Sequence, residues 1–211
     1  MKLVVERAAL LKALGHVQSV VERRNTIPIL SNVLLSADGQ ALRLTATDLD
    51  LQVVEEAPAV VEQAGAITVS AHTLFDIVRK IPDGAQVQLD ASGAKMVVTA
   101  GRARFQLQTL PREDFPVLGE GDLPVRFQLP AEALVALIDR SRFAISTEET
   151  RYYLNGIYFH APAGANVLRA VATDGHRLAR VDVPLPEGAA GMPDSIVPRK
   201  CIAEVRKLLD E

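Results

Sequence analysis

An aspartate, a glycine, a histidine and an arginine follow one another within the segment VATDGHRLARVDV, residues 171–183. A carboxylate beside an imidazole is a common source of general-base catalysis, so Asp174 and His176 are candidates for a catalytic pair. A hydrolase also needs a nucleophile within about 3 Å of the base, and a group that orients the base. The chain contains no GxSxG, HExxH, CxxC or GxxxxGK[ST] motif. We therefore expect no enzyme activity, metal or cofactor, and keep a hydrolase using Asp174 and His176 as the alternative.

An internal repeat suggests another role for this segment. ALRLTATDLDLQV (residues 41–53) matches VLRAVATDGHRLARV (residues 167–181), with Leu-Arg and Ala-Thr-Asp recurring at one offset. Both copies keep the aspartate, whereas the histidine has no counterpart in the first copy. Aspartate side chains accept hydrogen bonds from backbone N–H groups in turns. We therefore expect Asp48 and Asp174 to stabilise turns, with Gly175 supplying a φ that other residues resist.

The flanking segments repeat in the same order. KLVVERAALLKAL matches RFQLPAEALVALI, SNVLLSADG matches LNGIYFHAPAG, and ITVSAHTLFDIVRKI matches SIVPRKCIAEVRKLL. Apolar spacing and alternation predict that each copy reads strand, helix, strand, strand, helix, with LRLTATDLDLQVV as one alternating strand. The predicted helices are residues 7–18, 72–81, 131–142 and 200–210. The chain is expected to be α+β, with two domains of one topology.

The two copies differ in how far they continue. The first copy has three more predicted strands after its second helix, and the chain ends before their counterparts in the second copy. We therefore expect an incomplete second domain. The predicted boundaries are residues 1–115 for the first domain, 116–125 for a linker and 126–211 for the second domain.

Composition narrows the class of protein further. The 211 residues are 48% hydrophobic, with one cysteine, which fits a globular protein of a reducing cytoplasm. No apolar run approaches the roughly 20 residues that a membrane span needs, so no membrane partner is expected. His16 and His72 are expected on solvated helix faces.

Several motifs together resemble one family. YYLNG (residues 152–156), VATDGHRLA (171–179), IVPRK (196–200), TIPILSNVLL (26–35) and GRARFQLQTLPREDFP (101–116) resemble the bacterial DNA polymerase III beta subunit, the sliding clamp. The resemblance covers essentially the whole chain, as the first and most of the second of three domains, with the third domain absent. It implies a clamp fold, with helices on an inner face and antiparallel sheets on an outer face.

The resemblance also implies partners. Two chains join head to tail into a homodimeric ring that encircles double-stranded DNA without reading its sequence. DNA polymerase III subunits, the clamp loader and other replication and repair proteins attach through a short linear motif.

The site residues are carried over from the resemblance by position. The implied wall of the partner-peptide pocket is Leu154, Thr173, Gly175, His176, Arg177 and Leu178. Arg24 matches a DNA-contacting residue of the family. The other residues expected to face DNA, mostly cations of the predicted helices, are Arg79, Lys80, Arg140, Arg142, Tyr153, Arg199, Lys200, Arg206 and Lys207. The residues expected to contact a second chain are Ile77, Ile81, Arg102, Arg104, Phe105 and Leu107.

Three positions depart from the family pattern. Glu148 stands where the family has a DNA-contacting glutamine, and His72 and Thr73 stand where it has a basic pair. These departures keep a second alternative open, a peptide-binding scaffold without a role on DNA.

Charge gives an indication that does not depend on the family. The four predicted helices hold nine lysine and arginine residues against five acidic ones, in a chain with 23 basic and 26 acidic side chains. Clustered positive charge within an acidic protein is typical of a surface that faces phosphates. Nothing in the sequence resembles a base-reading helix, and aromatic residues are only 4% of the chain, so binding is expected to be independent of DNA sequence.

Overall fold

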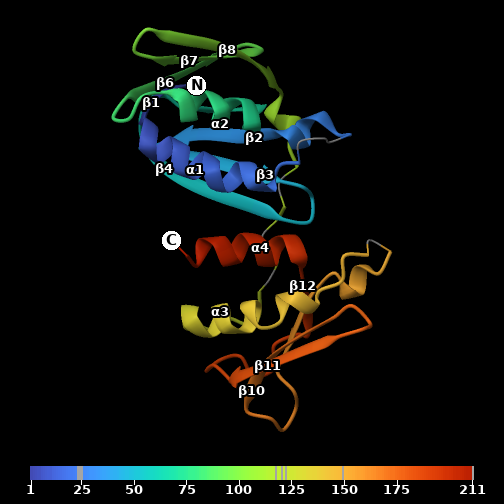
Figure 1. Cartoon of the computed structure of the whole chain (residues 1–211). Helices are drawn as coiled ribbons and strands as arrows, with labels where there is room; N and C mark the ends of the chain where they lie inside the picture. The colour runs from blue at the N-terminus through green and yellow to red at the C-terminus, as the bar shows by residue number, and fades with distance from the viewer. Residues whose placement is uncertain (23–25, 117, 120, 122, 149, 211) are drawn as a thin grey trace. The chain divides into compact units, whose positions relative to one another are not determined.

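The structure is a computed structural model that describes residues 1–22, 26–116, 118–119, 121, 123–148 and 150–210 (Figure 1). The chain divides into two compact units, Met1–Gly119 (unit 1) and Glu120–Glu211 (unit 2). Within the described ranges, no helix is both long and apolar enough to cross a membrane.

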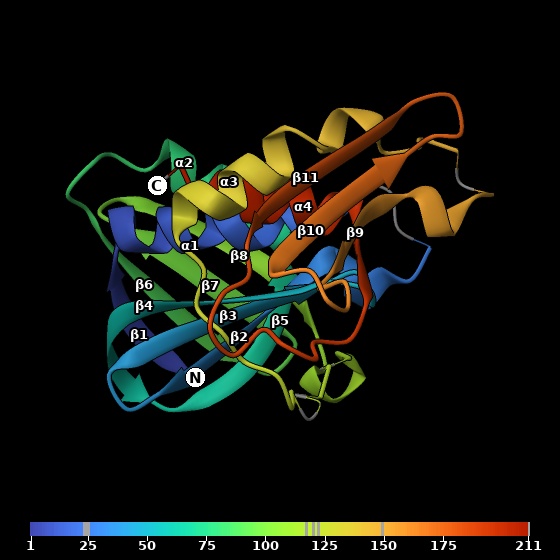
Figure 2. The ribbon, with the colours of Figure 1, turned by 90° about the horizontal axis from the view of Figure 1, so that it is seen from below.

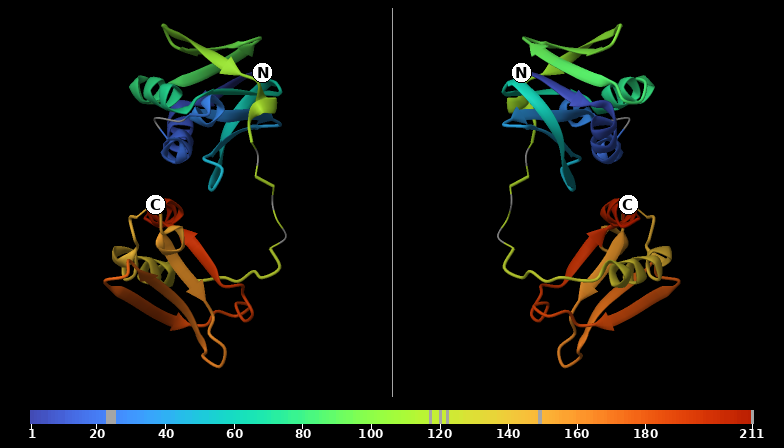
Figure 3. Two further views of the ribbon diagram at one scale, coloured as in Figure 1. Left: turned by 90° about the vertical axis from the view of Figure 1, so that its right-hand side faces the viewer. Right: turned by 90° about the vertical axis from the view of Figure 1, so that its left-hand side faces the viewer.

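Unit 1 packs helices against antiparallel strands. Its elements in chain order are β1 (Lys2–Glu6), α1 (Arg7–Val20), η1 (Pro28–Ser31), β2 (Asn32–Asp38), β3 (Ala41–Thr47), β4 (Gln52–Gln63), β5 (Gly65–Ser70), α2 (Ala71–Lys80), β6 (Gln86–Ser92), β7 (Lys95–Ala100), β8 (Ala103–Leu110) and η2 (Arg112–Asp114), where η is a 3₁₀ helix. The strands close on themselves in the order β1-β4-β3-β2-β5-β8-β7-β6. The two helices of unit 1 lie together on one side of these strands (Figure 3).

The amphipathic pattern of the sequence explains this packing. Helix α1 begins after Glu6, whose carboxylate accepts hydrogen bonds from the N–H groups of Ala8 and Ala9, as an N-cap residue does. Leu10, Leu14 and others at helical spacing are then buried against the sheet. The core of unit 1 therefore lies between its helices and its strands.

Unit 2 repeats the central part of this arrangement. Its elements are α3 (Ala131–Asp139), η3 (Arg142–Ala144), η4 (Tyr152–Leu154), β9 (Gly156–His160), β10 (Val167–Thr173), β11 (Leu178–Pro184), β12 (Ser195–Pro198) and α4 (Arg199–Leu208). The antiparallel sheet has the order β11-β10-β9-β12, and its β10–β11 hairpin is seen in Figure 2. Buried Leu137, Ile157 and Ile202 join helices and sheet in one core.

The predicted strand order is wrong in two respects. Four strands, not two, separate the helices of each unit, because the alternating run LRLTATDLDLQVV is broken by a turn after Thr47 into β3 and β4. The strand expected to open the second copy is absent from the described residues before α3, where residues 126–130 pair with no neighbouring strand. Alternation shows that residues face two sides, but it does not show where the chain reverses.

The predicted helix starts agree with the structure to within one residue, whereas the predicted ends are less accurate, most of all for α3. Helix α3 ends at Asp139 instead of residue 142. The Ser141 hydroxyl donates a 2.6 Å hydrogen bond to the carbonyl of Leu137, a local bond that competes with helix continuation. The chain then forms the separate turn η3.

Strand registers define which residues of the two units correspond. Leu34 of β2 pairs with Thr45 of β3, and Tyr158 of β9 pairs with Val171 of β10. Because Thr45 and Val171 occupy equivalent places before the Thr-Asp turn, Tyr158 corresponds to Leu34. By the same count Leu154 corresponds to Leu30, a residue that is important for the last Results subsection.

Equivalent positions have diverged where neighbouring strands approach each other closely. Gly156 of β9 lies so near β12 that a Cβ atom on it would be 2.3 Å from the carbonyl oxygen of Val197, so only glycine fits. The equivalent Asn32 in unit 1 is buried, and its Nδ2 donates a 3.0 Å hydrogen bond to Thr68 Oγ1.

The two equivalent hairpin turns also share an unusual backbone conformation. Leu49 has a φ of +82° and Gly175 a φ of +91°. A left-handed conformation costs a side-chain-bearing residue roughly 1–2 kcal/mol, and glycine avoids this cost. Unit 1 therefore carries strain at the position where unit 2 has none.

This difference predicts opposite effects of exchanging the residue type. We expect Leu49→Gly to stabilise unit 1 by about 0.5 kcal/mol, since part of the relieved strain is offset by greater freedom of the unfolded chain. We expect Gly175→Ala to destabilise unit 2 by about 1 kcal/mol for the opposite reason. Urea unfolding of both variants measures the two changes, and a loss of stability in Leu49→Gly would contradict the interpretation.

Candidate functional site

The carboxylate of Asp174 is engaged by the backbone of its own turn. Asp174 Oδ1 accepts hydrogen bonds from the N–H groups of His176 and Arg177, each 3.0 Å long. Asp174 Oδ2 accepts one of 2.9 Å from Arg177 Nε. These bonds favour the ionised carboxyl and lower the pKa of Asp174 to about 2. A carboxylate held in this way orients a turn and is poorly suited to accept a proton near neutral pH.

The first unit contains the same turn. Asp48 Oδ1 accepts from the N–H groups of Asp50 at 3.1 Å and Leu51 at 2.8 Å. In both copies the hydroxyl of the threonine before the aspartate accepts a hydrogen bond from the backbone N–H two residues further along the chain. The distance is 3.0 Å from Leu49 to Thr47 and 3.1 Å from Gly175 to Thr173. The prediction that both aspartates stabilise turns is therefore confirmed.

The structure does not support a catalytic arrangement around His176. The His176 residue is exposed, and Asp174 contacts its backbone N–H and not its ring. Among the residues that the structure describes, no cluster of His, Cys, Asp or Glu could hold a metal ion. The turn instead presents His176, Arg177 and Leu178 to solvent at the end of a rigid hairpin.

The predicted pocket residues gather around this hairpin. Leu178 begins β11 and is 65% exposed, whereas Leu154 is partly buried at the end of η4. A Cβ atom on Gly175 would be 3.2 Å from Arg151 Nη1, so the segment preceding η4 reaches the turn. Thr173 Oγ1 donates a 2.7 Å bond to the carbonyl of Arg177, and its hydroxyl thereby serves the turn.

One neighbour of these residues was missed by sequence reasoning. The Phe143 ring is 55% exposed, and the Arg177 guanidinium lies over it at 5.6 Å from the ring centre, a favourable cation–π contact. Helix η3, which carries Phe143, packs against β10 and β11. Nothing in the sequence spacing of Phe143 and Arg177 indicates this contact.

Four of the helix cations predicted to face DNA are paired with acidic side chains. Arg79 pairs with Asp76 at 3.0 Å, Arg142 with Asp139 at 3.2 Å and Lys207 with Glu204 at 2.7 Å. Arg206 is the most enclosed of them, with 18% of its side chain exposed. Among the described residues predicted to face DNA, the exposed cations that have no ion pair are Lys80, Arg140 and Arg199.

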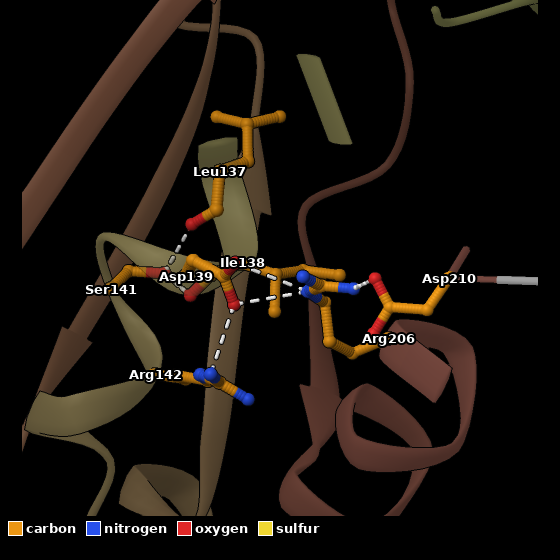
Figure 4. A network of polar contacts seen from close by, with 7 residues as sticks. All are labelled: Leu137, Ile138, Asp139, Ser141, Arg142, Arg206 and Asp210. Atoms are coloured by element: carbon orange, nitrogen blue, oxygen red, sulfur yellow. Dashed lines mark hydrogen bonds and ion pairs between the residues drawn. The ribbon is translucent and has the colours of Figure 1, made fainter. Parts of the chain in front are cut away.

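Arg206 joins the two helices of unit 2. Its Nε lies 3.1 Å from both carboxylate oxygens of Asp139 on α3, and its Nη1 bonds Asp210 beyond the end of α4 (Figure 4). Arg142 approaches the same Asp139 carboxylate from η3. Hydrogen bonds between charged groups are stronger than neutral ones, so this network fixes the spacing of α3 and α4.

The remaining predicted DNA-facing positions are less informative. Arg24 lies outside the described residues. Tyr153 is 55% exposed and packs edge-on against Tyr152, with ring centres 5.6 Å apart. Glu148, at the family's glutamine position, pairs with Arg151 at 3.1 Å.

The expectation of solvated histidines on the helices of unit 1 is wrong for His16. Its Nδ1 lies 2.7 Å from Glu55 Oε1, and 15% of its side chain is exposed. His72 Nε2 lies 2.9 Å from the carbonyl oxygen of Val21 and is partly buried. Both rings contact other elements, which a helical spacing pattern does not reveal.

Some of the residues predicted to contact a second chain are buried in unit 1, and others are exposed to solvent. Ile81 and Leu107 are 5% and 6% exposed and belong to the core of unit 1. Phe105 is 38% exposed, and Arg102 and Arg104 are exposed. In the described part of unit 1, β8 pairs with β5 only through Thr109 and Leu110. Its residues 103–108 therefore pair with β7 alone and offer a strand edge.

Comparison with known proteins defines the class to which this fold belongs. Residues 1–119 match the family model of the DNA polymerase III beta subunit N-terminal domain, and residues 128–211 match its central domain. The repeated unit, with paired helices against antiparallel strands, is that of the DNA clamps. The chain belongs to the DNA polymerase III beta subunit family.

Individual relatives agree with this assignment. The chain is 60% identical over its whole length to the beta sliding clamp of Caulobacter vibrioides strain NA1000, and 41% identical to that of Escherichia coli K12. A crystal structure of the Caulobacter crescentus clamp matches with a TM-score of 0.96 at 60% identity, covering 100% of this chain and 57% of that one. A Bartonella birtlesii clamp bound to griselimycin matches with a TM-score of 0.94 at 53% identity, covering 100% of this chain and 57% of that one. This chain spans 58% of the Caulobacter vibrioides relative and 57% of the Escherichia coli one.

The turn geometry predicts how Asp174 responds to acid. We expect its carboxyl to titrate with a pKa of about 2, below the ordinary 3.8, as followed by NMR shifts of the carboxyl and of the His176 and Arg177 N–H groups. Its contribution to stability is complete above pH 3.8 and declines as the pH falls toward 2, because the unfolded chain binds the proton first. Asp174→Asn is the control, since it keeps an oxygen acceptor and removes the titration. A midpoint near 3.8 in the folded protein would contradict this account.

Proposed function

We propose that this chain acts as part of a DNA sliding clamp, a processivity factor that encircles duplex DNA and tethers a replicative polymerase. Family membership supports this function. The activity is non-enzymatic and cytoplasmic in this proposal, with residues 1–115 and 126–211 as two clamp domains joined by residues 116–125. The excess of basic residues on the helices favours this function over that of a peptide-binding scaffold without a role on DNA.

One observation carries the DNA role. Lys80, Arg140 and Arg199 are exposed on helices or helix ends, and none has an ion-pair partner among the described residues. An unpaired cation can neutralise a phosphate without first losing an acidic partner, whereas Arg206 cannot. A few such contacts give weak, salt-dependent attraction that does not depend on base sequence. Weak attraction suits a protein that must move along DNA, with retention supplied by closure of a ring.

We further propose that the β10–β11 turn binds the linear motif of partner proteins. Leu178 offers an exposed apolar side chain next to Arg177, whose position is held by Asp174 and Phe143. Short-motif sites gain most of their affinity from apolar anchors in such places, with polar groups fixing orientation. Polymerase subunits, the clamp loader and repair proteins would compete for this one surface.

Ring closure would use the free edge of β8. Residues 103–108 pair on one side only, and Phe105 with Arg102 and Arg104 is exposed there. Strand addition to such an edge provides backbone hydrogen bonds and lets the alternating side chains set the register. A head-to-tail contact of this kind joins two different surfaces and closes when the rotation permits.

Binding of a mixed-sequence DNA duplex tests the DNA role. We expect Lys80→Ala and Arg140→Ala each to lower the salt dependence of the binding constant, by about one in the slope of log K against log salt. Lys95→Ala on strand β7 is the matched control and should leave the slope unchanged. Fluorescence anisotropy across a salt series measures all three. An equal change in the Lys95 variant would refute a helix-borne DNA surface.

Griselimycin binding tests the pocket, since a related clamp binds this compound. We expect Leu178→Asp to weaken its binding at least tenfold, about 1.4 kcal/mol, because a carboxylate replaces the apolar anchor. Val60→Asp is the matched control, an exposed aliphatic residue on β4 of unit 1. Calorimetric dissociation constants that agree between Leu178→Asp and the parent chain would place the compound elsewhere.

A further inference from the structure

Unit 1 contains a counterpart of the surface proposed to bind partner motifs in unit 2. Strand registers make Leu30 the equivalent of Leu154. The shared Thr-Asp turn makes Gln52, the first residue of β4, the equivalent of Leu178, the first residue of β11. Leu154 and Leu178 of the proposed pocket wall therefore have equivalents on η1 and at the end of the β3–β4 turn.

The chain itself covers this counterpart surface. Phe115 is 5% exposed and forms a separate apolar cluster with Ile29 and Leu30, which are 8% and 3% exposed. Three residues later, the N–H group of Leu118 donates a 3.0 Å hydrogen bond to Gln52 Oε1. One short segment after β8 thus contacts the equivalents of both Leu154 and Leu178.

The segment is anchored where it leaves the sheet. Thr68 Oγ1 donates a 2.8 Å hydrogen bond to the carbonyl of Leu110, the last residue of β8. The helical turn η2 follows, and the Phe115 N–H closes it with a 3.1 Å bond to the carbonyl of Arg112. Phe115 is extended, with a φ of −81° and a ψ of 120°, and Pro116 follows it. A phenylalanine in an extended segment is thereby presented to η1.

The equivalent surface of unit 2, which no such segment covers among the described residues, is more exposed to solvent. Tyr153, the equivalent of Ile29, is 55% exposed, and Leu178 is 65% exposed. Ile29 is only 8% exposed in unit 1. The aromatic side chain of Phe115 fills in unit 1 the kind of apolar surface that unit 2 leaves open to solvent.

We propose that the surface formed by η1 and the β3–β4 turn is a second peptide-binding site, and that its ligand is the chain's own segment around Phe115. The ligand class is an extended peptide with a phenylalanine followed by a proline. A short tether holds this ligand at an effective concentration in the millimolar range, so free peptides compete poorly. Unit 1 is therefore closed to partner motifs while unit 2 remains open. The inference rests on the proposed pocket of unit 2 as its reference.

A labelled copy of the segment tests the proposal in the 211-residue chain. The probe is the fluorescein-labelled peptide PREDFPVL, the sequence of residues 111–118. Phe115→Ala removes the apolar anchor of the tethered ligand and is expected to tighten probe binding at least tenfold relative to the parent chain. Leu123→Ala, which trims an exposed side chain further along, is the matched control and should bind the probe as weakly as the parent. A folded Phe115→Ala protein with no gain in binding would overturn the proposal.

A second substitution identifies the unit that binds the probe. The gain should persist in a Phe115→Ala chain that also carries Leu178→Asp, because the probe occupies unit 1. Loss of the gain there would place the probe on unit 2, which would overturn this inference and leave the proposed partner pocket intact.

If Phe115→Ala does not fold, a tryptophan at position 115 tests whether the segment is bound to the surface of unit 1. The chain has no tryptophan, so Phe115→Trp introduces a single fluorophore at the seat of the segment. Tryptophan emission that is shifted to shorter wavelength and protected from quenching by acrylamide supports a segment bound to this surface. Solvent-like emission with full quenching would overturn it.

Discussion

A carboxylate that accepts two successive backbone N–H groups sets the arrangement of both units. Asp48 and Asp174 make this interaction after a threonine whose hydroxyl binds a third N–H group. Side-chain oxygens thereby accept hydrogen bonds from N–H groups that have no strand partner within the turn. With the donors satisfied, the chain can reverse sharply, and one alternating run becomes a hairpin. The helices of each unit then have a sheet to pack against, and the turn remains outside as a rigid projection.

The sequence correctly predicted that the aspartates stabilise turns, but it did not predict that the turn divides one alternating run into two strands. The repeat showed that Asp174 has a structural role, because its counterpart Asp48 persists where the histidine does not. The same alternation concealed the reversal at Thr47, since residues on both sides of a turn can keep the period of a strand. Helix starts were predictable because Glu6 and Pro130 mark them locally. The early end of α3 depends on a single hydroxyl at Ser141, and propensity alone does not capture that.

Contacts between distant residues account for most of what the sequence could not predict. The pairs of His16 with Glu55 and of Phe143 with Arg177 join elements whose approach depends on the tertiary fold. The charge count over the helices had the same limit, because it treated every lysine and arginine as available. Pairing with nearby carboxylates withdraws Arg79, Arg142, Arg206 and Lys207 from that count. Burial likewise assigns Ile81 and Leu107 to the core. Composition indicates an excess of basic residues on the helices, and the ion pairs show which of these residues already have an acidic partner.

The close approach of β9 and β12 at Gly156 limits the exchange of segments between the two copies of the repeat. The two copies have the same register, yet the equivalent residues Asn32 and Gly156 meet different neighbours. Asn32 contacts a threonine hydroxyl, whereas a Cβ atom on Gly156 would lie 2.3 Å from a carbonyl oxygen. Replacing β9 by the sequence of β2 would place an asparagine against that oxygen and disrupt the sheet. The two copies of the repeat are therefore not interchangeable at this strand, even though their folds agree.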